Sequence, residues 1–166
     1  AGTSLPGRRE PERQQGRSGV MALASRVSLI TLGVADLARA RRFYAALGWR
    51  EAEESNETIA FFQLAGQVLA LFSRGALASE MGRVDLPEGS GSVTLAQNLG
   101  SDAEVDALHD AMVTAGAESL RAPSPTSYGG YVGYVADPDG HVWELAHVDA
   151  FPLAADGTLT LPSVAS

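Results

Sequence analysis

The chain of 166 residues is 45% hydrophobic and 19% charged, which is enough to bury the core of one domain. Its formal net charge of −8 argues against binding to nucleic acid or to an anionic membrane, and the lack of cysteine and lysine excludes disulfides, thiolate ligands and Schiff bases. No apolar run approaches the roughly 18 residues of a membrane span, so we expect a cytoplasmic protein.

The N-terminal stretch has a composition of its own. Residues 1–20 are rich in Gly, Arg, Pro and polar side chains and show no apolar period. Such a stretch cannot bury enough apolar surface to offset the entropy lost on ordering, so we predict a disordered tail. Met21 directly precedes the first patterned segment, and whether the residues before it are native stays open.

A first module is predicted over residues 26–74. The β-branched run at 26–34 predicts a strand, and Asp36 can cap a following helix that ends at Gly48. The other strands are expected at 49–53, 58–64 and 67–72, the last two joined by a hairpin at Ala65-Gly66. The order of elements is β-α-β-β-β.

A second module is predicted over residues 91–148, after a linker at 75–90 that contains one helical turn near 76–81. Ser101 and Glu104 form a capping-box signature that opens a helix, which Gly116 ends. Strands are expected at 92–97, 118–121, 131–136 and 141–148, with a loop around Pro123 and Pro125. The C-terminal extension, 149–166, is expected to lie as an extended segment over an edge or a partner.

The two modules repeat the same order of elements, so the predicted fold class is α+β with two βαβββ modules. Neither module can cover both faces of its own sheet. We therefore expect the modules to pair into a curved mixed sheet that forms a cavity, with the helices outside. The pairing can occur within one chain or between two chains.

The strand that closes the second module carries an unusual charge. Asp137 to Gly140 predicts a tight turn, and Glu144 follows in mid-strand between apolar neighbours. A carboxylate at such a place is either a site residue or a structural charge held by hydrogen bonds to Ser92, Thr94 or Thr31. The residues leave both readings open.

The sequence resembles the vicinal oxygen chelate superfamily, which contains glyoxalases, bleomycin-resistance proteins and extradiol dioxygenases. The resemblance is carried by two segments, one in each module: Gly33-Val34-Ala35-Asp36-Leu37 with Phe43-Tyr44 and Leu47-Gly48-Trp49, and Asp137-Pro138-Asp139-Gly140-His141-Val142-Trp143-Glu144. It covers the chain from Arg26 to Val148. It implies paired βαβββ modules with a cavity inside the curved sheets.

The resemblance also implies where metal ligands would lie in an enzyme of this superfamily. The four positions fall on Leu29, Ala70, Ser92 and Glu144, of which Glu144 alone suits a hard cation. Because such sites need three or more protein ligands, no metal or other cofactor is expected. His141 and His147 point to the opposite side of the strand from Glu144 by the period-two rule, so they cannot readily share its metal.

Strand parity also predicts the residues that face the cavity. Most are small or apolar, which suits an uncharged, partly aromatic ligand with a few polar anchors. Trp49 is expected to border the cavity mouth, and Tyr131 belongs to a glycine-flanked loop that could act as a lid. The candidate ligand-binding residues are Leu29, Thr31, Trp49, Phe72, Ser92, Thr94, Tyr131 and Glu144.

The leading functional hypothesis is a metal-independent protein of the resistance or sequestration type that binds a small apolar or aromatic molecule, as a homodimer. The alternative is a lyase, isomerase or dioxygenase of the superfamily that uses Glu144 as a general base or metal ligand. A third possibility is a structural dimer whose cavity is filled by its own side chains.

Overall fold

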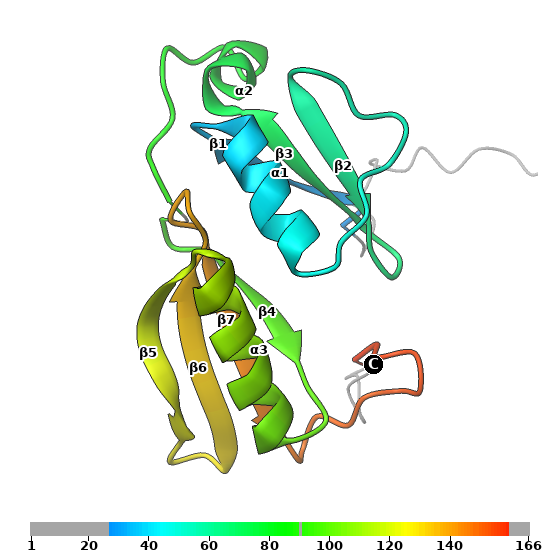
Figure 1. The fold of residues 1–166 in the computed structure, drawn as a ribbon, viewed down its shortest axis with the longest axis vertical. Coiled ribbons are helices and arrows are strands. Elements are labelled where there is room, and N and C mark those ends of the chain that lie inside the picture. The colour runs from blue at the N-terminus through cyan, green and yellow to red at the C-terminus, as the bar shows by residue number, and fades with distance from the viewer. Residues whose placement is uncertain (1–26, 90, 160–166) are drawn as a thin grey trace, which may run out of the picture.

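The computed structural model describes residues 27–89 and 91–159, and the predicted tail at 1–20 lies outside this range. The chain forms two modules, each with a mixed sheet and one long helix, and both long helices lie in front of their sheets in Figure 1. A short third helix follows the first module. The predicted α+β class with two modules is confirmed.

The first module begins with a strand and a helix whose start was visible in the sequence. The Asp36 side chain accepts a hydrogen bond from the Arg39 backbone N–H, which caps the helix as predicted. The strands lie in the order β1-β3-β2, with β1 parallel and β2 antiparallel to β3. The elements are β1 (Leu29–Val34), α1 (Leu37–Ala46), β2 (Ile59–Gln63) and β3 (Val68–Ser73).

The strand expected at 49–53 is absent from the described residues as a regular strand, and an isolated bridge between Glu51 and Phe62 marks its place. The Trp49 backbone N–H donates to the Tyr44 carbonyl, and the Trp49 ring stacks on the Tyr44 ring. This turns the chain toward the core as it leaves α1, and the charged residues that follow face water. The helical turn expected near 76–81 is present as α2 (Arg74–Glu80), which is longer than one turn and lies at the start of the linker.

The second module has the full predicted order of elements. The Ser101 hydroxyl caps the helix, and Gly116 ends it with a φ of 113°. The strand expected at 118–121 is longer than predicted: β5 continues to Pro125 and includes Pro123, which an edge strand with register shifts tolerates. The elements are β4 (Thr94–Asn98), α3 (Asp102–Ala115), β5 (Glu118–Pro125), β6 (Gly130–Ala136) and β7 (Val142–Val148), in the sheet order β4-β7-β6-β5.

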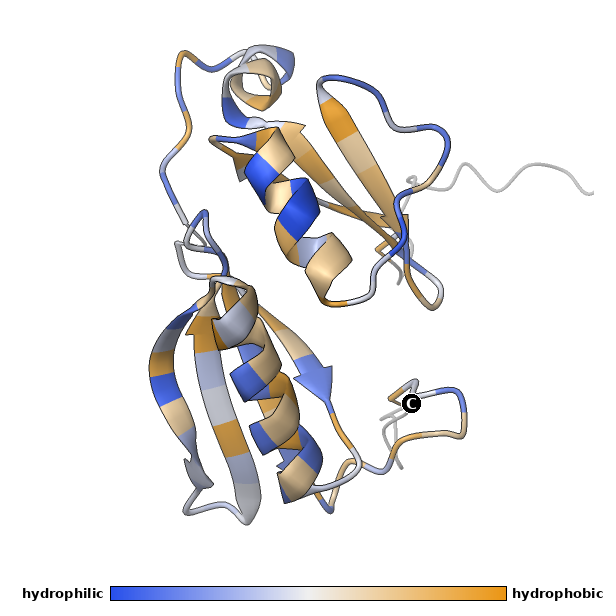
Figure 2. Ribbon diagram, in the orientation of Figure 1, coloured by the Kyte–Doolittle hydropathy of each residue, from blue (hydrophilic) through white to orange (hydrophobic). Residues whose placement is uncertain are grey.

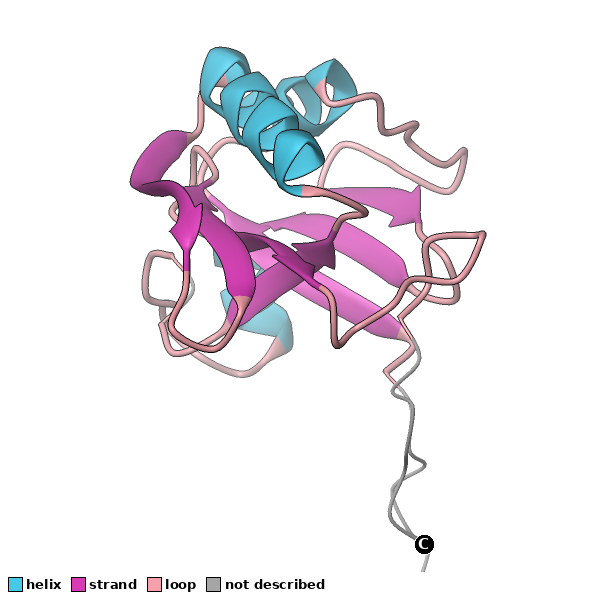
Figure 3. Ribbon diagram, turned by 90° about the horizontal axis from the view of Figure 1, so that it is seen from below, coloured by secondary structure: helices cyan, strands magenta, loops and turns pink. Residues whose placement is uncertain are grey.

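One hydrophobic core runs through both modules on the helix side of the sheets. Phe43 and Tyr44 of α1 pack with Phe62, and Val105 of α3 packs in the same cluster as Leu145. Figure 2 shows the apolar colour concentrated along the strands, and the end-on view of Figure 3 shows α3 on one side of them. Within the described residues, no helix has the length and apolar character needed to cross a membrane.

The opposite side of the two sheets, which we call the open face, carries the alternate residues. Pairing in register places Leu29 beside Val68, and Ala96 beside Glu144, on this face. Its side chains are partly or fully exposed at several positions, including Leu29, which is 44% exposed. Among the described residues no strand of one sheet pairs with a strand of the other, so β1 and β4 are edge strands of their sheets.

Candidate functional site

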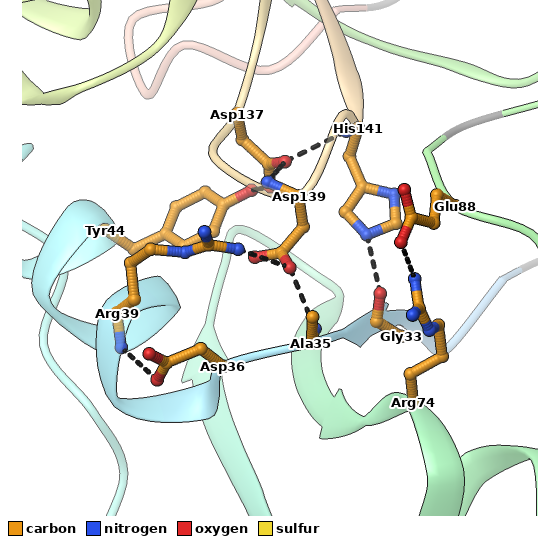
Figure 4. Close-up of polar contacts among 10 residues, drawn as sticks. All are labelled: Gly33, Ala35, Asp36, Arg39, Tyr44, Arg74, Glu88, Asp137, Asp139 and His141. Carbon is orange, nitrogen blue, oxygen red and sulfur yellow. Dashed lines mark hydrogen bonds and ion pairs between the residues drawn. The ribbon is translucent and has the colours of Figure 1, made fainter.

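The turn at Asp137 to Gly140 joins the second module to the first (Figure 4). The Asp139 carboxylate accepts hydrogen bonds from the Ala35 backbone N–H and from Arg39 Nη2, both at 2.8 Å. The His141 ring contacts the Gly33 carbonyl through Nε2 at 3.0 Å, where the nitrogen must donate. These contacts tie the turn to the end of β1 and the start of α1.

The side chains of Asp139 and His141 bind backbone groups of β1 that a neighbouring strand would otherwise bind. The Ser28 carbonyl accepts from Val68 of β3, so the backbone groups of every second residue from Ser28 face β3. The Gly33 carbonyl and the Ala35 N–H have the opposite parity and point to the outer edge of β1. The two side chains satisfy these edge groups, so this end of β1 is closed to further pairing.

Asp137 organises the buried half of the same junction. Its carboxylate accepts from the Tyr44 hydroxyl at 2.8 Å and from the backbone N–H groups of Asp139 and His141 at 2.9 Å. The Trp143 indole in turn donates to the Tyr44 oxygen at 3.2 Å. Burial raises the pKa of Tyr44, and the Asp137 charge raises it further, so Tyr44 keeps its proton.

Glu144 lies on the open face, half-buried in β7. Its cross-strand neighbours are Ala96 on β4 and Tyr134 on β6. Burial raises the pKa of Tyr134, and the neighbouring Glu144 carboxylate raises it further. Tyr134, across the strands from Glu144, is therefore a polar neighbour of this carboxylate.

Strand parity alone could not identify Tyr134 as this neighbour. The pairing of β6 with β7 fixes which tyrosine of the glycine-rich stretch lies across from Glu144, and this register is a tertiary property. Arg121 of β5 pairs with Tyr134 in turn, and its positive charge acts on Tyr134 in the opposite sense, lowering the pKa. A polar cluster of Glu144, Tyr134 and Arg121 therefore crosses the open face of the second module.

The open face of the first module holds an apolar hollow of about 370 Å³. Two predicted residues lie in or near such hollows. Leu29 lines this one, and Thr31 lines a second hollow of about 290 Å³ under the linker. Phe72 is half-buried in β3 on the same face as Leu29. The residues that line the first hollow are Leu29, Ala52, Glu54, Phe61, Gln63 and Val68.

The other predicted residues lie apart from these hollows. Trp49 belongs to the aromatic core, where its ring centroid is 5.1 Å from that of Tyr44 and 5.9 Å from that of Trp143. The Tyr131 hydroxyl donates to Asp106 of α3 at 2.9 Å, and its neighbour across the sheet is His147 on the helix side. Ser92 is exposed in a turn before β4, and Thr94 is exposed on β4.

The residues present do not fit a metal centre of the kind found in related enzymes. Of the four mapped positions, Leu29, Ala70 and Ser92 bring no ligand that binds a divalent cation well, and Glu144 stands alone. Within residues 27–89 and 91–159, no group of three or more His, Asp or Glu side chains could hold a metal ion. We therefore derive no chemical step through a metal at this face.

Comparison with known proteins places the fold in a family. The family described as "Glyoxalase/Bleomycin resistance protein/Dioxygenase superfamily" matches residues 26–145. A comparison with curated proteins gives no match.

Solved structures give the same result. A glyoxalase-related enzyme from Fulvimarina pelagi is 38% identical, with a TM-score of 0.78 over 84% of this chain and 100% of that chain. A glyoxalase/bleomycin resistance protein/dioxygenase from Nocardioides is 20% identical, with a TM-score of 0.65 over 89% of this chain and 93% of that one, and shows the fold alone. The chain therefore belongs to the glyoxalase/bleomycin resistance protein/dioxygenase superfamily.

Proposed function

We propose that this protein binds a small, largely apolar or aromatic molecule on its open face without a metal, as a resistance or sequestration protein does. The observation that carries the proposal is the lining of this face. It has an apolar hollow beside Leu29 and Phe61 in the first module, and the Glu144–Tyr134 pair in the second. An apolar wall with a few fixed polar groups is typical of sites for small organic molecules.

The hollow has walls suited to an aromatic ring. Leu29, Phe61 and Val68 offer apolar contacts, and burying an aromatic ligand of moderate size against them removes apolar surface from water. Glu144 adds a hydrogen-bond acceptor on the other module, since a carboxylate can accept several hydrogen bonds. Glu144 does not line the hollow, so the ligand would be held mainly by burial in the first module and would have to extend to the second module to be oriented by Glu144.

We also propose that a second copy of the chain covers the open face. The face exposes apolar side chains such as Leu29, and a surface of this kind is usually covered in a soluble assembly. Sedimentation-equilibrium ultracentrifugation is expected to give twice the 17.3 kDa mass of the chain. A mass equal to one chain at micromolar protein would contradict this part of the proposal.

The rival function is a lyase, isomerase or dioxygenase reaction with Glu144 as general base or metal ligand. The observation that favours a base is the position of Tyr134 across the strands from Glu144, where a second proton-bearing group lies beside the carboxylate. The two functions differ in what Glu144→Gln removes. If Glu144 is a general base, Glu144→Gln keeps the ligand affinity and loses turnover. If Glu144 only binds the ligand, Glu144→Gln lowers the affinity.

The test is calorimetric titration of EDTA-treated protein with a panel of planar aromatic natural products. We expect at least one compound to bind with a micromolar dissociation constant, and we expect Glu144→Gln to weaken its binding several-fold. Glu57→Gln is the matched control, because Glu57 is exposed in the loop before β2. Binding that requires added Zn²⁺, Ni²⁺, Mn²⁺ or Fe²⁺, and is abolished by Glu144→Ala, would contradict the proposal.

A further inference from the structure

The open face has a charge pattern that the proposed function does not use. Of the six described residues that line the hollow of the first module, Glu54 alone is charged, beside the apolar walls of Leu29, Phe61 and Val68. The open face of the second module carries Glu144. Each module therefore brings at least one carboxylate to the open face.

Among the described residues, neither carboxylate has a cationic partner. Within the described part of the chain, the ion pairs involve Asp139, Glu51, Glu88, Asp102, Asp110 and Asp149, and neither Glu54 nor Glu144 takes part in one. Arg41, which lies near the loop that carries Glu54, is already bound to Glu51 at 3.1 Å and to the Ile59 carbonyl.

The nearby cation on the second module is also engaged. Arg121 donates from Nη2 to the Ser124 hydroxyl at 3.0 Å. It acts on Tyr134, where it opposes the effect of Glu144, and it forms no ion pair with Glu144 within 4.0 Å. The whole chain has a net charge of −8, so its long-range field adds to the attraction of these carboxylates for a cation.

We infer that the hollow lined by Leu29, Phe61, Val68 and Glu54 takes an aromatic molecule that bears a protonated amine, with the ring on the apolar walls and the ammonium at Glu54. The inference rests on the proposed function and adds the charge of the ligand to it. A neutral molecule gains the apolar contacts alone. An anion of the same shape is repelled by Glu54 and by the field of the chain.

Three probes with one ring system test this inference: 1-naphthylmethylamine, 1-naphthalenemethanol and 1-naphthoate, titrated calorimetrically into the full chain at low salt. We expect the amine to bind at least about threefold more tightly than the alcohol, as a partly exposed ion pair provides, and the naphthoate to bind most weakly. High salt should reduce the preference for the amine.

Variants locate the charge that sets the preference. Glu54→Gln should bind the amine and the alcohol with equal affinity. The affinity for the alcohol should equal that of the wild type, which also shows that the variant is folded. Glu53→Gln, one residue away and outside the lining of the hollow, should keep the wild-type preference.

The outcomes separate this inference from the proposed function. Equal affinity of the amine and the alcohol for the wild type would overturn the inference and leave the proposed function standing. A preference for the amine that persists in Glu54→Gln would overturn the assignment to this hollow. No binding of any of the three probes would overturn both.

Discussion

Tyr44 connects the hydrogen bonds of the junction to its aromatic core. Its hydroxyl donates to Asp137 and accepts from Trp143, and its ring packs on Trp49 and Phe62. Helical spacing alone predicts that Tyr44 is a core residue. Its role in joining the modules depends on contacts 93 and 99 residues away along the chain, which spacing does not reveal.

Tyr44→Phe should destabilise the fold while keeping the shape of the core. The change removes the donor to Asp137 and the acceptor for Trp143, and leaving buried polar groups unpaired costs about 1–3 kcal/mol. Urea unfolding followed by tryptophan fluorescence measures the loss. Tyr128→Phe, at a side chain that is 65% exposed, is the control and should change the free energy of unfolding by less than about 0.5 kcal/mol.

The same residue predicts how stability depends on pH. Burial raises the pKa of Tyr44 above the ordinary 10.0, so the folded state binds this proton more tightly than the unfolded state does. The stability from this proton is complete below pH 10.0 and falls as the pH rises above it. Unfolding free energies measured between about pH 9 and pH 11 should fall more steeply for the wild type than for Tyr44→Phe. Equal slopes for the two proteins would contradict this account of Tyr44.

Among the elements, the pair β5 and β6 is held at a close approach that requires glycine. A Cβ on Gly133 would lie 2.9 Å from Cγ and 3.2 Å from the backbone nitrogen of Pro123, and neither atom can move freely. Gly133 thus lets the proline-containing edge strand lie against β6.

Gly133→Ala should therefore destabilise the second module by about 1–3 kcal/mol, as overpacking does. Gly75→Ala is the matched control in α2, because a Cβ there meets nothing within 4 Å. That change should be neutral or stabilising by up to about 1 kcal/mol, since alanine has the higher helix propensity. Thermal unfolding of both variants checks the prediction, and a Gly133→Ala protein as stable as the wild type would refute it.

The elements also show where sequence reasoning succeeds. The caps at Asp36 and Ser101 and the helix end at Gly116 are local features, and the sequence predicted each of them. The full length of β5 and the missing strand near residue 51 depend on pairing with distant segments. Local propensity does not determine such pairing, so these features could not be predicted.

For the whole molecule, the repeated order of elements was the most informative sequence feature. It predicted two modules, and parity correctly placed Leu29 and Glu144 on one side of their sheets. What it could not predict is the junction. The sequence predicts a turn at Asp137 to Gly140 that precedes a possible site. In the structure this turn also connects the two modules through hydrogen bonds.

The two sides of the sheets therefore have different roles, one in stability and the other in the proposed ligand binding. The helix side of the sheets holds the continuous core and the joint, so substitutions there change stability first. The open face carries the apolar hollow, Glu54 and Glu144, so substitutions there should change ligand binding and leave the fold intact. Such a division explains why a carboxylate with an incomplete set of partners is tolerated at Glu144.

The most direct measurement of the central claim is amide chemical-shift mapping of the full chain with 1-naphthalenemethanol in the presence of EDTA. The account predicts shifts at open-face residues, including Leu29, Val68, Ala96 and Glu144, with Val105 and Met112 on the helix side unchanged. Shifts confined to the helix side, or shifts that appear only when a divalent metal is added, would contradict it.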